Sequence, residues 1–378
     1  MFISKMEKLL PFKIKGEIVM YTFFHDKFQE QIRKALEEKY NRGEIDEIKE
    51  MLNNGSLQGM YREVIDSTSV LLEKGLIERM DSMYKEEKFF ATDHEKRLEN
   101  VWRKGFVYLQ SIIKISEDCG IEFIDSLNEK DKHDSELISI LGVVLKIHAK
   151  SIQTAKEVFT LLKAGYPDGA MARWRSLHEN TVIFRVLTSK YPDKEETLSI
   201  IERYLDYMHI ENYKEVRNDK RVSSDTKRAL KRKRDEALEK YGKEFAYANM
   251  WAKPLVGNVD NIYFHHLEKL AGIDRLNEYY NESNRYVHTS PKGMYESLSF
   301  VPEFKQDKYY LFGGSNYGLS IPGQLTGISL MHLTSRLLMF NINLDALIMI
   351  EVLSNFSEKC NEAFNDIQKD VKQEIRDS

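Results

Sequence analysis

Cysteine, proline and glycine are scarce in this 378-residue chain. Two cysteines, Cys119 and Cys360, are too few for a disulfide framework or a zinc cluster. Both are expected to be reduced thiols of a cytoplasmic protein. Seven prolines and nineteen glycines are few for this length. Their scarcity favours long helices over a sheet with many turns.

Long apolar runs are also missing. Residues 1–24 interleave lysine and glutamate with apolar residues, so they lack the uninterrupted apolar core of a signal peptide. No window reaches the roughly 18 charge-free apolar residues that a membrane span requires. The nearest approach, residues 337–353, is interrupted by Asn341, Asn343 and Asp345. We therefore expect a protein without a membrane partner.

Neither sign of charge dominates, because 56 basic residues face 60 acidic ones and the net charge is −4. This balance gives no general electrostatic case for binding nucleic acid. The locally basic run Lys220–Lys240 is typical of a helical patch that binds RNA phosphates. Its interspersed carboxylates and its lack of aromatic residues favour a solvated helix instead. RNA binding through this run therefore remains one of two alternatives.

Motifs that hold metals or cofactors are absent from the sequence. No HExxH or CxxC motif occurs. A di-iron bundle would need paired Glu-x-x-His motifs, and the nearest approach, Asp206 with His209, stands alone. The sequence therefore predicts neither a metal nor a cofactor.

Apolar periodicity predicts an all-α, multi-helix bundle. The charged residues 128–134 suggest a boundary between an N-terminal helical region (1–130) and a helical core domain (131–378) that ends in a long helix. Asp134 or Ser135 is the predicted cap of a long apolar helix that runs to Leu162. Residues 289–322 interrupt the helical pattern with proline and glycine, and the sequence near 308–321 could pair as a small β-hairpin.

The predicted helix Gly169–Ser189 is apolar on two sides and nevertheless carries Arg175 and Glu179 one turn apart. Burial of such a pair costs several kcal/mol per ion, so stability alone explains it weakly. Perturbed charges in a packed environment are candidates for a functional site. The alternative is a structural ion pair that fixes the helix register.

A second polar segment, Ser283–His288, is predicted to end a helix. His288 at that C-terminus either interacts with the helix dipole as a simple cap, or meets the Arg175–Glu179 pair in space.

The RSLHE sequence at 175–179 and the SNRYVH sequence at 283–288 resemble the two motifs of a bacterial helical family, domain of unknown function 5677. The resemblance covers about residues 135–289 and carries over Arg175, Glu179, Ser283 and His288 without assigned chemistry. In style the family is similar to helical proteins of phage-defence and toxin systems.

Arg173 and His178 are similar in spacing to the motif of helical ribonucleases of the higher-eukaryote-and-prokaryote nucleotide-binding class. That similarity implies an arginine that holds the scissile phosphate and a histidine that works as acid and base.

Two functional hypotheses follow. The first is a metal-independent, ribonuclease-like effector of a phage-defence or toxin system. Arg173 or Arg175 would hold a phosphate, His178 or His288 would move protons, and Glu179 would orient one of them. The second is a non-enzymatic interaction or scaffold protein that forms a homodimer through its long C-terminal helix.

Overall fold

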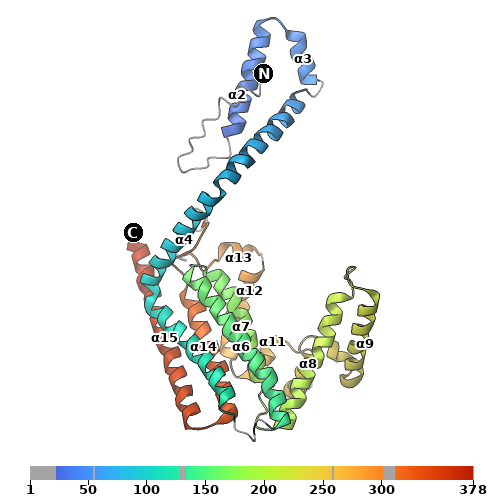
Figure 1. Cartoon of the computed structure of the whole chain (residues 1–378), viewed down its shortest axis with the longest axis vertical. Helices are drawn as coiled ribbons and strands as arrows, with labels where there is room; N and C mark the ends of the chain where they lie inside the picture. The colour runs from blue at the N-terminus through green and yellow to red at the C-terminus, as the bar shows by residue number, and fades with distance from the viewer. Residues whose placement is uncertain are drawn as a thin grey trace. The chain divides into compact units, whose positions relative to one another are not determined.

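The computed structural model describes residues 23–53, 56–127, 131, 133–257, 259–288, 290–300 and 311–377. Throughout these ranges the regular structure is helical and contains no strand, which confirms the all-α prediction (Figure 1). The chain divides into two compact units, Met1–Glu87 and Lys88–Ser378. The expected boundary near residue 130 stays a prediction.

The first unit contains α2 (Phe23–Asn41), α3 (Ile45–Asn53) and the first part of the 70-residue helix α4 (Ser56–Asp125). Gly43 adopts φ +79° in the turn between α2 and α3. This left-handed conformation favours glycine because it lacks a Cβ atom.

The core of the second unit is formed by the last part of α4, α6 (Ser135–Lys163), α7 (Pro167–Leu187), α14 (Ser320–Leu338) and α15 (Leu344–Asp377). Figure 1 shows α6 and α7 side by side, and both pack against α14. Asp134 caps α6 as predicted, since its carboxylate accepts a hydrogen bond from Leu137 N at 2.9 Å.

Among the described helices, α6 is the one long and apolar enough to cross a membrane by length and composition. The core helix of a soluble protein meets the same criterion. In this fold, residues such as Ile140, Val144 and Val158 of α6 are buried against neighbouring helices.

The second unit contains further helices after α7. α8 (Lys194–Val216) and α9 (Ser224–Tyr241) form a helical pair, followed by the short helices η1 (Lys243–Ala246), η2 (Met250–Ala252) and α10 (Lys253–Val256). α11 (Phe264–Ala271), η3 (Asp274–Leu276) and α12 (Asn277–Val287) then pack on α7. α13 (Pro291–Tyr295) follows, and η5 (Met339–Asn341) links α14 to α15.

The β-hairpin expected near 308–321 is wrong for the described part of that segment, and residues 308–310 lie outside it. Residues 311–319 contain no strand, and α14 begins at Ser320. The loop's backbone pairs elsewhere, because Ser315 N donates to Gly165 O at 2.7 Å and Asn316 O accepts from Trp102 Nε1 at 3.2 Å. These polar groups are therefore committed to the α6–α7 turn and to α4 rather than to a partner strand.

Candidate functional site

The Arg175–Glu179 ion pair forms as the helical spacing predicts. Arg175 Nε lies 3.2 Å from Glu179 Oε1, one turn apart on α7. The side chains are 21% and 40% exposed. The pair therefore lies at the half-buried edge of the fold, where water still screens it, rather than in a dry interior.

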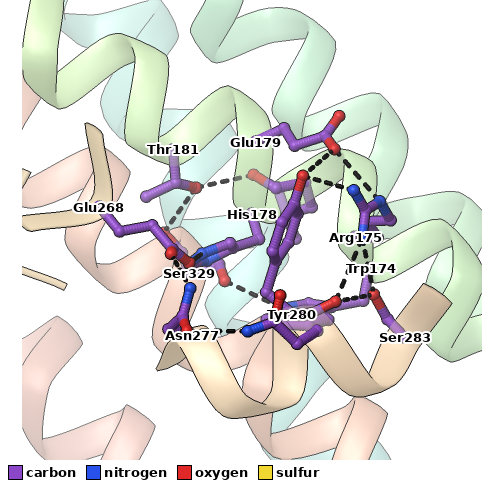
Figure 2. Close-up of polar contacts among 12 residues, drawn as sticks. Trp174, Arg175, His178, Glu179, Thr181, Glu268, Asn277, Tyr280, Ser283 and Ser329 are labelled. Carbon is purple, nitrogen blue, oxygen red and sulfur yellow. Dashed lines mark hydrogen bonds and ion pairs between the residues drawn. The ribbon is translucent and has the colours of Figure 1, made fainter. Parts of the chain in front are cut away.

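Most donors of Arg175 are used inside the protein (Figure 2). Its Nη1 donates to Tyr280 O at 3.1 Å and to Asn284 Oδ1 at 2.8 Å, and it approaches Ser283 Oγ at 3.5 Å. Its Nη2 donates to the Tyr280 hydroxyl, and its guanidinium lies 3.8 Å from the centre of the Tyr280 ring. These contacts fasten α12 to α7 through hydrogen bonds and a cation–π interaction.

Tyr280 is the centre of this arrangement, and the sequence analysis missed it. Its hydroxyl donates to Glu179 Oε1 at 2.7 Å, and its ring stacks on Phe264 with centroids 4.4 Å apart. Burial and the neighbouring Glu179 carboxylate raise the pKa of Tyr280, so it keeps its proton. The available sequence signal was its position three residues before Ser283, on the same face of α12.

A second polar layer, more deeply buried than the first, lies beside it in Figure 2 and joins α7 to α11. His178 and Glu268 are both fully buried, and His178 Nε2 lies 2.7 Å from Glu268 Oε1. Asn277 donates to the other carboxylate oxygen. The Trp174 ring lies 5.1 Å from the imidazole, while His178 Nδ1 has no hydrogen-bond partner among the described residues. The sequence did not predict a role for Glu268, because this residue belongs to no recognisable motif.

The remaining predicted residues lie elsewhere. His288 is exposed just beyond the end of α12, and neither a hydrogen bond nor an ion pair joins it to Arg175 or Glu179 in the described structure. Arg173 forms its ion pair with Glu157 of α6. The fold therefore brings Arg175, Glu179 and Ser283 together, with His178 in the adjacent layer. It does not bring Arg173 or His288 to this site.

The basic run on α9 is largely compensated on its own helix. Arg228 pairs with Asp225, Lys231 lies 3.4 Å from Asp235, and Arg232 lies 3.6 Å from Glu236. Such pairs are typical of a solvated helical face. RNA binding through Lys220–Lys240 stays a prediction.

A pocket of about 360 Å³ opens between α8, α9 and η1, away from the Arg175 contacts. Its lining combines apolar, aromatic and basic side chains: Ile210, Tyr213, Lys214, Arg217, Arg234, Ala246, Tyr247 and Ala248. Within the described ranges, no group of three or more His, Cys, Asp or Glu residues is placed to hold a metal ion.

Comparison with known proteins supports the resemblance drawn from the two motifs. Searches of curated proteins and of solved structures found no significant match. None of the comparisons supports similarity to helical ribonucleases. The model of a family of unknown function (DUF5677) matches residues 141–306. That range contains both polar layers, so residues 141–306 are similar to this family over the segment where α7, α11 and α12 meet.

Proposed function

We propose that this protein acts by binding a partner, not by catalysis, and that the Arg175 contacts hold the binding fold together. The observation that carries this proposal is the use of Arg175 donors by Glu179, Tyr280 and Asn284. A catalytic arginine must offer its donors to the substrate. Here a phosphate would first have to displace internal hydrogen bonds to a charged group, each worth about 1.5–3 kcal/mol.

The more deeply buried histidine supports the same conclusion. A general base must come within hydrogen-bond reach of the proton that it removes. His178 and Glu268 are fully buried and face each other. An RNA chain could reach this pair only if α12 moved off α7.

An exposed apolar patch offers the binding surface. Ile342, Leu344, Leu347 and Ile348 at the start of α15 are each more than half exposed. Asn341 Nδ2 lies 3.4 Å from Ser126 Oγ, which places this turn beside the end of α4. Clustered exposed apolar side chains are typical of protein–protein interfaces.

We assign this patch to a second copy of the chain. The patch carries one ionised residue, Asp345, within residues 339–350, so an identical apolar patch complements it. A two-fold dimer buries the same surface on both copies and is the commonest oligomer.

Size-exclusion chromatography with light scattering tests the dimer. The double variant Leu344→Glu/Leu347→Glu should be monomeric, because it places charge in a desolvated interface. Ile77→Glu, at an apolar residue of the first unit whose exposure lies between those of Leu344 and Leu347, is the control and should remain dimeric. A monomeric native protein would refute the dimer.

Incubation with total RNA in EDTA tests the catalytic alternative. The expected result is intact RNA with the native protein. RNA cleavage that is lost in a folded Arg175→Lys variant would overturn the binding proposal and restore the ribonuclease hypothesis.

A further inference from the structure

A group of three arginines and one histidine lies near the far end of α7. Arg185 comes from α7, Arg275 from η3, and His332 and Arg336 lie one turn apart on α14. Arg275 Nη2 is 3.2 Å from His332 Nε2. Arg185 Nε donates to Ala271 O at 2.6 Å, and Arg336 Nε donates to Thr188 Oγ1 at 3.0 Å. Arg185 and Arg336 are therefore held near each other by hydrogen bonds to the C-terminal ends of α11 and α7.

These three arginines have no carboxylate partner among the described residues. This sets them apart from the other arginines of α7, because Arg173 pairs with Glu157 and Arg175 with Glu179. Arg185, Arg336 and His332 are partly buried, so water screens their mutual repulsion less than it would on an open surface. A bound anion would remove that repulsion.

Helix capping uses only some of the guanidinium nitrogens of these arginines. Arg185 and Arg336 donate to the C-terminal ends of α11 and α7, where cations are favoured by the helix dipole. Capping uses Nε of Arg185 and both Nε and Nη2 of Arg336. It leaves both terminal nitrogens of Arg185 and Nη1 of Arg336 without a described protein acceptor.

His332 completes a set of donors. Burial and the nearby Arg185, Arg275 and His178 lower the pKa of His332 to about 4, so the ring is neutral at pH 7. Because arginine can only donate, His332 Nε2 accepts from Arg275. Its proton then lies on Nδ1, which is a further donor. Glu268, the acidic residue of α11, is committed to His178 and Asn277.

We propose that Arg185, Arg275, His332 and Arg336 form a binding site for a phosphate group, either free phosphate or a phosphate monoester. Guanidinium groups bind phosphate oxygens with paired, charge-assisted hydrogen bonds, and three of them match a divalent anion. The site is independent of the dimer proposed above.

Isothermal titration of the full chain with inorganic phosphate, in a chloride buffer of constant ionic strength, tests the site. A parallel titration with adenosine monophosphate tests phosphate carried on an organic molecule. Saturable binding of either probe is expected. Arg275→Gln should weaken that binding about tenfold or more, the effect of losing one charge-assisted hydrogen bond.

The matched control is Arg97→Gln, which removes the same charge from an exposed face of α4 and should bind like the native chain. Arg275 is exposed, and among the described residues its side chain makes one hydrogen bond, to His332, so its variant should fold. Failure of both probes to bind, or equal binding by the Arg275 variant, would overturn the proposal.

The titration of His332, followed by NMR of its ring protons, gives a second readout. A bound phosphate stabilises the imidazolium and should raise the pKa of His332 from about 4. A merely structural arginine cluster would leave that pKa unchanged when phosphate is added.

Discussion

Removing the hydroxyl of Tyr280 tests one of the contacts that join α12 to α7. In Tyr280→Phe the ring keeps its stacking on Phe264 and its position under Arg175. The variant loses the 2.7 Å hydrogen bond to Glu179 and the acceptor for Arg175 Nη2. A hydrogen bond to a charged group contributes about 1.5–3 kcal/mol. Since Glu179 is 40% exposed and water can replace the partner, we expect a loss near or below the lower limit of that range, about 1–2 kcal/mol.

Urea unfolding followed by circular dichroism measures this loss as a lower midpoint with an unchanged slope. Tyr279→Phe is the matched control, because the neighbouring hydroxyl has no hydrogen-bond partner in the described structure. It should unfold like the native chain. If Tyr280→Phe is as stable as Tyr279→Phe, the hydroxyl does not fasten α12, and the structural interpretation of Arg175 fails with it.

Three further predictions concern buried groups. Glu268→Ala should cost about 3–5 kcal/mol in urea unfolding, because it leaves the buried His178 and the half-buried Asn277 without their acceptor; a loss below about 1 kcal/mol would contradict the buried pair. Burial lowers the pKa of His148 to about 4 in the folded protein. Below about pH 6.5 the unfolded chain therefore binds a proton at this histidine that the folded chain does not bind. Stability should therefore fall between pH 6.5 and 4, by up to about 3 kcal/mol; His148→Gln should flatten that fall, and an identical pH profile would refute it. Burial raises the pKa of Cys119 to about 11 and also raises that of Cys360, so neither thiol should react with a disulfide reagent at pH 8 until the chain is unfolded; rapid labelling of the native protein would show that they are accessible.

The sequence predicted what depends on neighbouring turns of one helix. The Arg175–Glu179 pair follows from a four-residue spacing, and the Asp134 cap follows from one polar residue before an apolar run. The all-α class follows from the length of the periodic segments.

Contacts between distant segments were not predictable in the same way. In sequence, Tyr280 lies 101 residues from Glu179, and Glu268 lies 90 residues from His178. Nothing in the local sequence indicates which of these side chains will be in contact. His288 shows the opposite case. α12 ends at Val287, so the imidazole belongs to the following segment and lies in solvent while Ser283 packs against α7.

The arginines of α7 show why residue type alone does not identify a site. Arg173, Arg175 and Arg185 lie on one helix, and the first two are neutralised by carboxylates at short range. Arg185 meets Arg336 and a helix end instead. A paired guanidinium has little to gain from an external anion, whereas an unpaired one beside other cations gains both hydrogen bonds and relief from repulsion. The motif-bearing part of α7 is therefore best suited to holding the fold together, and its opposite end to binding an anion.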